Sequence, residues 1–452
     1  MTPLFNDKQF YRSLFALAIP IMLQTLLNSA VNLLDTIMIG RLGTIEIAAV
    51  GLGNQIFFLY NVFLFGICSG GAVFAAQFWG RGDIQGIRKN LGFCLTLNLA
   101  SGVIFTLVAF IIPERIIGIY SRDEAVIEAG AVYLRILSFS FIPFAANLAF
   151  TLSLRSVEKV RLAIVATVVA IIINGTLNYL LIFGIGPFPA MGVEGAALGT
   201  VISRVVEALI IVIMSYVLKY VPAGSLRELL SYNRRFIRQF FRITLPVIAN
   251  EVFWSTGVTV QNIIFARTDT DAIAAFNIVG TVQMLTWVLF LGLGNGVAVL
   301  IGKKIGEQDE KTAREYASKI NRFAPLLAIG AAMVLYPFSR IMPYVFNVNP
   351  GTLQAASHMF IILCFSYPFR AFNMSMIIGV CRAGGDTVFC VIYDIAFMWF
   401  VALPLAACAG FIFGAPVWII YLCIALEEPL KAMLGIWRFK TGKWLHNVTS
   451  GF

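Results

Sequence analysis

Long apolar segments recur along the whole chain, and they constrain its fold more than any other feature. A helix that crosses a lipid bilayer needs about 20 mostly apolar residues. Segments of about that length or longer fall at 13–39, 46–78, 89–112, 130–153, 160–184, 192–218, 239–265, 272–302, 320–338, 355–379, 387–411 and 415–437. This pattern predicts an all-α integral membrane protein with about twelve transmembrane helices.

The charge content supports the same conclusion. Charged residues make up 12% of the 452 residues, about half the share found in soluble domains. So few charges cannot cover a water-exposed surface, so membrane lipid must be part of the solvent. The net charge of +10 would suggest nucleic acid as the partner of a soluble protein. Here the basic residues lie in short connections between apolar segments, and we expect no nucleic-acid partner.

The distribution of basic residues predicts the orientation of the chain. Lys and Arg are concentrated in alternate connections, around 81–89, 155–161, 219–242 and 303–322, and in the tail after Arg438. The intervening connections hold few, such as Arg41 and Arg115. Cytoplasmic connections are the ones that carry excess Lys and Arg. We therefore expect a multi-pass protein with both termini in the cytoplasm.

The longest basic connection lies near the middle of the chain. Residues 219–242 read KYVPAGSLRELLSYNRRFIRQFFR. They divide the sequence into an N-terminal lobe of six helices at 1–219, a cytoplasmic linker at 220–238 and a C-terminal lobe of six helices at 239–452. The mixture of aromatic and basic residues fits a helix at the surface of an anionic membrane, but a solvated linker is equally compatible with it.

The two halves resemble each other in sequence. Matching positions include Pro20 and Pro246, Arg41 and Arg267, Ile47-Ala48-Ala49 and Ile273-Ala274-Ala275, and Gly66, Gly70, Gly80 and Asp83 with Gly292, Gly296, Gly306 and Asp309. All pairs have one separation, 226 residues (267 − 41). An even number of helices per copy keeps both copies in the same orientation, as in parallel transporter repeats. The repeat predicts two pseudo-symmetric bundles and favours transport, although a channel can share this plan.

A polar stripe marks the first apolar segment. Gln24, Asn28, Asn32 and Asp35 are spaced by four, four and three residues, which places them on one helical face. Polar groups within a membrane are costly and commonly face a cavity or a partner. The stripe therefore predicts a cavity, with Asp35 as its acidic group. The alternative is a carboxylate that reaches the outer membrane surface.

Three further polar residues can complete a site with Asp35. Asn174 and Asn178 are four residues apart on the fifth segment, and Thr200 lies early in the sixth. Together with Asp35 they offer the oxygen ligands that hard cations such as Na⁺ require. Alternatively, Asp35 alone can carry a proton, because burial disfavours its charged form. A third interpretation is that the two asparagines only join helices by hydrogen bonds.

The second half contains a different polar set. Glu251 and Ser255 lie on the seventh segment, Arg370 and Asn373 on the tenth, and Asp394 on the eleventh. With Gln24, Asn28 and Asn32 we predict that these residues line the substrate cavity. Because an unpaired buried charge is expensive, we expect Arg370 to pair with Asp394. Glu251 would then be free for a cationic substrate.

Other charged residues have structural interpretations. Arg204 and Glu207 are three residues apart and are expected to pair, and Glu427 and Glu428 precede Lys431 on the last segment. The chain has no Walker motif and no histidine with a catalytic partner, and its cysteines show no metal-binding pattern. We therefore expect neither an enzyme nor an ATP-driven pump, and no cofactor other than a coupling ion.

Four motifs together resemble the multidrug and toxic compound extrusion (MATE) family. They are LLDTIMIGRLGTIEIAAVGLGNQI at 33–56, INGTLNYLLIFG at 173–184, GVEGAALGTVISR at 192–204 and LEEPLKAMLGIWRFKTGKW at 426–444. The last motif is similar to one bacterial branch, which implies the bacterial cytoplasmic (inner) membrane. The resemblance also implies a V-shaped pair of six-helix bundles around a central cavity. It implies export of cationic or amphipathic drugs and metabolites against inward Na⁺ or H⁺.

The resemblance also assigns roles to residues. Asp35 fits the key acidic position of the first helix, Asn174 and Thr200 fit ion-site positions, and Asn178 stands where some members carry Asp. Pro20 fits the proline at which the first helix is proposed to bend, and Pro246 is its counterpart in the second repeat.

The second lobe departs from the family pattern. Glu251 is similar to the acidic residue of the seventh helix. Residues 369–373 lack the acidic residue that some members carry on the tenth helix, and Asp394 is the candidate substitute. The sequence leaves open whether Glu251 and Asp394 form a second coupling site.

These observations predict an ion-coupled antiporter that works by alternating access, and we expect it to be a monomer. One alternative is a flippase for lipid-linked saccharides, which needs a strongly cationic cavity, whereas Asp35 and Glu251 make this one acidic. Another alternative is an uncoupled channel. The sequence identifies neither the substrate nor the coupling ion, Na⁺ or H⁺.

Overall fold

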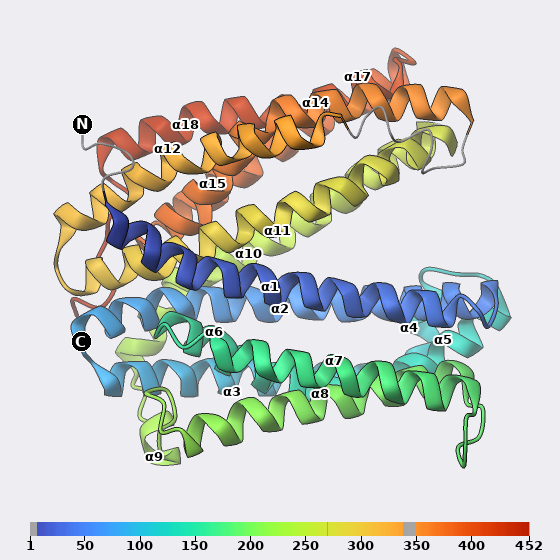
Figure 1. The fold of residues 1–452 in the computed structure, drawn as a ribbon, viewed down its shortest axis with the longest axis horizontal. Helices are drawn as coiled ribbons and strands as arrows, with labels where there is room; N and C mark the ends of the chain where they lie inside the picture. The colour runs from blue at the N-terminus through green and yellow to red at the C-terminus, as the bar shows by residue number, and fades with distance from the viewer. Residues whose placement is uncertain (1–6, 269, 338–348, 452) are drawn as a thin grey trace. The chain divides into compact units, whose positions relative to one another are not determined.

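The computed structural model describes residues 7–268, 270–337 and 349–451, without the side chains of 270, 271 and 285. Over this part of the chain the structure is helical and contains no β-strand beyond one isolated bridge between Gly385 and Leu445. Figure 1 shows long helices joined by short connections. The predicted all-α fold is confirmed.

The first six predicted spans correspond to helices of the N-terminal half. These are α1 (Lys8–Ile39), α2 (Thr44–Arg81), α3 (Ile84–Ile111), α5 and α6 together (Glu124–Leu137 and Phe141–Ser156), α7 (Arg161–Phe183) and α8 (Gly192–Val217). Two short helices, α4 (Pro113–Gly118) and α9 (Leu226–Leu229), lie in connections. Figure 1 shows α7 and α8 side by side, and they are in contact along much of their length.

The other six spans correspond to helices of the C-terminal half. These are α10 (Arg234–Thr268), α11 (Thr270–Gly306), α12 (Glu310–Leu335), α14 (Pro350–Met374), α15 with α16 (Thr387–Phe397 and Leu403–Ala407) and α17 with α18 (Val417–Ala425 and Glu427–Thr441). The α14 helix continues as a π-helix through Ser375–Arg382, and further π-helical turns at Met398–Ala402 and Cys408–Ile412 extend α15 and α16.

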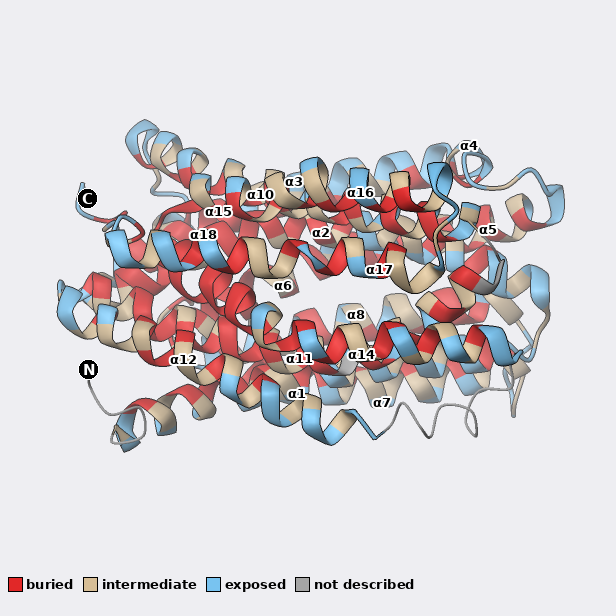
Figure 2. Ribbon diagram, turned by 90° about the horizontal axis from the view of Figure 1, so that it is seen from above, coloured by how far each residue is buried: buried red, intermediate tan, exposed pale blue. Residues whose placement is uncertain are grey.

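Ten helices of the described chain are long and apolar enough to cross a membrane. The two remaining predicted spans are α10, which carries Asn250 and Glu251 near its middle, and α17 with α18, which are separated by a turn at Leu426. Large apolar side chains are exposed on several helices, including Ile111, Ile172, Val217 and Phe400. Figure 2 shows such exposed positions along the helices, as expected of surfaces that contact lipid.

The chain divides into two compact units. One, the N-terminal unit, comprises residues 23–240, and the other, the C-terminal unit, comprises the described residues of 241–452 together with those up to Met22. This division differs from the predicted lobes because the first half of α1 clusters with the C-terminal helices. The cause is close packing: a Cβ on Gly296 would lie 3.2 Å from atoms of Ala18, and a Cβ on Gly292 would lie 3.1 Å from the Ala18 carbonyl oxygen. These glycines therefore allow a close helix–helix approach.

Asp7, the residue before α1, forms an ion pair with α12. Lys319 Nζ of α12 lies 2.7 Å from Asp7 Oδ2, and the rings of Phe10 and Tyr316 lie 4.7 Å apart. The hydrogen bond from Lys319 lowers the pKa of Asp7 below its usual value. Both contacts fix the start of α1 to the C-terminal unit.

The central connection is packed against the N-terminal unit. Ser225 caps α9 through a capping box with Glu228, and Arg88 of α3 lies 2.6 Å from Glu228. A Cβ on Gly92 would clash with the backbone of Leu229, so only glycine admits this contact. Beyond α9, Phe236 and Phe240 pack against Phe93. Residues 225–240 are thus a docked segment and not a solvated linker.

Candidate functional site

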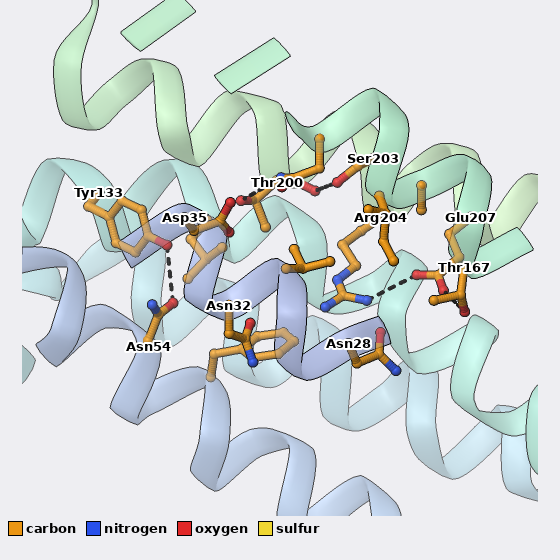
Figure 3. Close-up of a pocket in the computed structure, with 16 residues that line it drawn as sticks. Asn28, Asn32, Asp35, Asn54, Tyr133, Thr167, Thr200, Ser203, Arg204 and Glu207 are labelled. Carbon is orange, nitrogen blue, oxygen red and sulfur yellow. Dashed lines mark hydrogen bonds and ion pairs between the residues drawn. The ribbon is translucent and has the colours of Figure 1, made fainter. Parts of the chain in front are cut away.

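The unit of residues 23–240 contains a small polar pocket between five of its helices. The volume of this pocket is about 50 Å³. Its lining comes from α1 (Asn28, Val31, Asn32, Asp35), α2 (Asn54, Phe57), α5 (Tyr133, Leu137), α7 (Thr167, Ala170, Ile171, Asn174) and α8 (Thr200, Ser203, Arg204, Glu207). Figure 3 shows how these side chains lie around it.

The structure brings the four predicted ion ligands together, and three of them, Asp35, Asn174 and Thr200, line the pocket. Asn178 donates from Nδ2 to Asp35 Oδ1 over 2.7 Å and to Asn174 Oδ1 over 3.4 Å. Asn174 in turn donates from Nδ2 to Thr200 Oγ1 over 3.4 Å. The structure therefore joins these residues of α1, α7 and α8 in one hydrogen-bonded chain. Their role as ion ligands stays a prediction.

Asn178 is held in its position by the neighbouring helix. Its side chain is fully buried, and a Cβ on Gly199 of α8 would clash with Asn178 Oδ1. The same oxygen has no hydrogen-bond partner among the described residues. A buried acceptor without a partner is costly, so this amide oxygen has unused capacity to bind a donor or a cation.

A second hydrogen-bonded chain reaches α1 at Gln24, about three helical turns before Asp35. Arg204 lies 3.0 Å from Glu207, which confirms the predicted pair. Glu207 also accepts a hydrogen bond from Thr167 (2.8 Å), and Thr167 accepts one from Gln24 (3.3 Å). Gln24 accepts a further bond from Arg155 (3.3 Å). Gln24, predicted as a cavity residue, is thus buried in a network behind the pocket.

Sequence reasoning missed several pocket residues. Tyr133 of α5 donates to Asn54 Oδ1 of α2 over 3.1 Å, and both side chains line the pocket (Figure 3). Arg204 lies over the ring of Phe144, 5.3 Å from its centroid. Neither Asn54 nor Tyr133 has a polar neighbour at helical spacing, so the sequence offered no local signal for them.

The size of the pocket limits what it can hold. Sites for drug-sized ligands measure about 300–1,000 Å³, whereas one water molecule needs about 10–15 Å³. A pocket of about 50 Å³ therefore has room for an ion with a few waters and not for a drug. Its carboxylate, amide and hydroxyl oxygens are ligands that suit hard cations.

The charges around the pocket single out Asp35. Glu207 is paired with Arg204, but no ion pair joins Asp35 to another residue in the described part of the chain. Its hydrogen-bond partner there is the neutral Asn178 amide. A carboxylate without an ion-pair partner inside a membrane protein favours a bound cation or a proton.

The expected pair of Arg370 and Asp394 is wrong. Arg370 lies 3.5 Å from Glu428, and Asp394 lies 2.9 Å from Lys431. Asp394 also accepts a hydrogen bond from Asn250 over 2.8 Å. The sequence could not rank these partners, because Lys431 and Glu428 reach α15 and α14 only through the packing of α18 in the C-terminal unit.

The expectation that Glu251 is free is also wrong. Arg382, at the end of the π-helical extension of α14, lies 2.9 Å from Glu251 Oε1. The remaining predicted cavity residues of this unit are buried too. Ser255 donates to the carbonyl of Val252 (2.9 Å), and Asn373 donates to Glu428 (2.7 Å). Pro20 and Pro246 lie inside α1 and α10, and their role in bending stays a prediction.

A comparison with protein families gives one match to both halves. The family model MatE matches residues 20–180 and again residues 246–408. The two matches start at Pro20 and Pro246, the separation predicted for the internal repeat. The repeat is therefore confirmed.

Similar proteins cover nearly the full length. The uncharacterized transporter YisQ of Bacillus subtilis is 26% identical over 97% of this chain and 96% of its own. The probable multidrug resistance protein NorM of Thermotoga maritima is 24% identical over 96% and 93%. A crystal structure of a mutant of the Vibrio cholerae MATE transporter VcmN superposes with a TM-score of 0.88 at 16% identity, covering 98% of this chain and 99% of the other. The structure of an outward-facing multidrug resistance MATE family transporter superposes with a TM-score of 0.86 at 20% identity. This match covers 95% of this chain and 96% of the other.

Proposed function

The chain belongs to the MatE family of multi-pass membrane transporters, and from this premise we propose that it is an antiporter that exports cationic or amphipathic small organic molecules. Inward movement of Na⁺ or H⁺ drives the export. The coupling ion binds in the pocket at Asp35. The observation that carries the proposal is a carboxylate without an ion-pair partner in a pocket of ion size.

The ion site uses the chain of residues around Asp35. Asp35 supplies the negative charge, and the side-chain oxygens of Asn174 and Thr200 line the same pocket. The unpartnered Asn178 Oδ1 becomes a ligand if this amide rotates to present its oxygen to the pocket in exchange for its NH₂ group. For H⁺ in place of Na⁺, Asp35 is the group that receives the proton, and the Asn178 oxygen becomes its acceptor.

The substrate class rests on the relatives. Several carry the name multidrug resistance protein, including NorM of Thermotoga maritima and NorM of Mesorhizobium japonicum. The pocket at Asp35 is too small for such substrates, so ion and substrate occupy different sites. Coupling then requires that ion and substrate stabilise different conformations of the transporter.

Location and assembly follow as parts of the proposal. The basic connections around 81–89, 155–161 and 303–322 favour the cytoplasmic side of a bacterial inner membrane for both termini. A monomer suffices for the mechanism, because the pocket is lined within one chain.

The test is Asp35→Asn in purified, reconstituted transporter. We expect coupled efflux to fall at least about 10-fold, to the level of empty liposomes, while the variant keeps its folding and expression, because the amide preserves shape but removes the charge. Asp123→Asn is the matched control, since Asp123 caps α5 in an exposed connection. Normal coupled efflux by Asp35→Asn would refute the proposal.

Gradients applied one at a time identify the ion. Proteoliposomes with only a Na⁺ gradient or only a pH gradient are loaded with a fluorescent organic cation. Efflux against the concentration of the cation in one of the two conditions supports antiport and names the ion. Flux only down its own gradient would indicate a channel, and movement of a lipid-linked saccharide without cation export would indicate a flippase.

A further inference from the structure

The C-terminal unit contains a buried cluster of charged side chains that the proposed ion site does not use. Its members come from α10 (Glu251), the α14 helix with its extension (Arg370, Arg382), α15 (Asp394) and α18 (Glu427, Glu428, Lys431). No side chain among them is more than 16% exposed. Because water has little access to these side chains, their charges must be compensated within the cluster.

The positive and negative charges of the described cluster members are unequal in number. Four carboxylates face three basic groups. Full ionisation would leave one negative charge without compensation in a membrane interior. An uncompensated buried charge is expensive, and a carboxyl group in this situation commonly keeps its proton.

Three of the carboxylates have their own basic partner. Glu251 lies 2.9 Å from Arg382, and Asp394 lies 2.9 Å from Lys431. Glu428 lies 3.5 Å from Arg370 and accepts a 2.7 Å hydrogen bond from Asn373.

Glu427 is the carboxylate that remains. Its nearest basic group is Lys431 at 3.6 Å, which already pairs more closely with Asp394. The residue is 6% exposed, and its Oε2 atom has no hydrogen-bond partner among the described residues. The orphaned oxygen and the surplus charge are separate observations, and both point to the same group.

We propose that Glu427 is a proton-binding site of the C-terminal unit and is neutral in this conformation. The charged groups that face it are Lys431 and Glu428 on α18, Asp394 on α15 and Arg370 on α14. The ammonium group of Lys431 disfavours a metal cation at this position. A proton on the carboxyl oxygen instead removes the surplus charge. The site is separate from Asp35, so it stands whether or not the proposed coupling at Asp35 is correct.

Infrared spectroscopy of the purified transporter tests the proposal directly. A protonated carboxylic acid has a carbonyl stretching band that a carboxylate and a glutamine lack. The difference spectrum between wild type and Glu427→Gln at neutral pH is expected to show the loss of one such band per chain. Glu428→Gln is the matched control on the same helix, and it is expected to keep the band because Glu428 has Arg370 as its own basic partner.

A second measurement covers the case of overlapping bands. The unfolded chain releases this proton near the ordinary glutamate pKa of about 4.3, whereas the folded protein holds it. As the pH rises from about 4.3 to neutral, the Tm of the wild type is therefore expected to fall more than the Tm of Glu427→Gln. Retention of the band in Glu427→Gln, or an equal change of Tm in both proteins over this range, would overturn the proposal. A rise in Tm with Na⁺ that is lost in Glu427→Gln would overturn it as well, because the ligand would then be a metal cation.

Discussion

Asn178 of α7 donates a hydrogen bond of 2.7 Å to Asp35 of α1, although 143 residues separate them in the chain. This contact sets the rotation of both helices around the pocket. It also makes the amide of Asn178 the group that any ion at Asp35 must displace or recruit. The environment of Asn178 is therefore as important for ion binding as the carboxylate.

Gly199→Ala is expected to damage the ion site without replacing any of its proposed ligands. The added Cβ would clash with Asn178 Oδ1 and push this side chain away from Asp35. Overpacking of this kind costs about 1–3 kcal/mol of stability. We expect a lower Tm and a weaker dependence of efflux on the coupling ion. Gly51→Ala is the control, because a Cβ there would meet no atom within 4 Å; equal behaviour of the two variants would contradict the prediction.

The pair of Asp394 and Lys431 is expected to contribute to stability. Asp394→Asn should lower the free energy of unfolding by about 3 kcal/mol, because it removes the closer partner of a buried lysine. This loss is at the low end of the range for breaking a buried ion pair, because the Glu427 carboxyl group remains 3.6 Å from Lys431. Adding Lys431→Met should restore part of it in a detergent-unfolding assay.

A double-mutant cycle separates this pair from the one that the sequence suggested. We expect a coupling energy of about 1–3 kcal/mol between positions 394 and 431 and a clearly smaller one between 394 and 370. The reverse order would show that Arg370 is the partner of Asp394 in the membrane.

The docked segment after α8 is expected to loosen at acid pH. Hydrogen bonds from the Ser225 backbone and side chain and from Arg88 lower the pKa of Glu228 below its ordinary value. The charged carboxylate therefore stabilises the segment above pH ~4.3, and this contribution is lost as the pH falls through the lower pKa of the folded state. Hydrogen exchange of residues 225–231, corrected for intrinsic rates, should rise over that range.

The same change is expected at neutral pH in Glu228→Gln, which mimics the protonated group. Glu128→Gln, at an exposed position of α5, should leave residues 225–231 unchanged. Protection that is independent of pH and unchanged in Glu228→Gln would show that the contact of Leu229 with α3 holds the segment alone.

Much of the fold could be predicted because lipid imposes simple rules on sequence. Apolar length marked the spans, and the paired prolines, arginines and glycines marked the repeat. The sequence placed all of α1 in the N-terminal lobe, whereas its first half clusters with the C-terminal helices. Nothing local to residues 8–22 reveals that Ala18 packs against the small residues of α11. Such packing depends on surfaces that meet only after folding.

The candidate site could be predicted where its residues share a helical face. The stripe from Asn28 to Asp35 and the pair of Asn174 and Asn178 satisfied that condition. Tyr133 and Asn54 did not, because neither has another polar residue three or four positions away on its own helix. The choice among basic partners for Asp394 failed for a related reason: charge type is visible in sequence, but the rotation of α14 and α18 is not.

The small volume of the pocket at Asp35 has a consequence for ion selectivity. Space for only a few waters means that an entering cation must give up much of its hydration shell to carboxylate, amide and hydroxyl oxygens. Dehydration energy would then discriminate between Na⁺ and a larger or more strongly hydrated ion. Enlarging the pocket by shortening one of its side chains, as in Ile171→Ala, is expected to lower the selectivity between these ions.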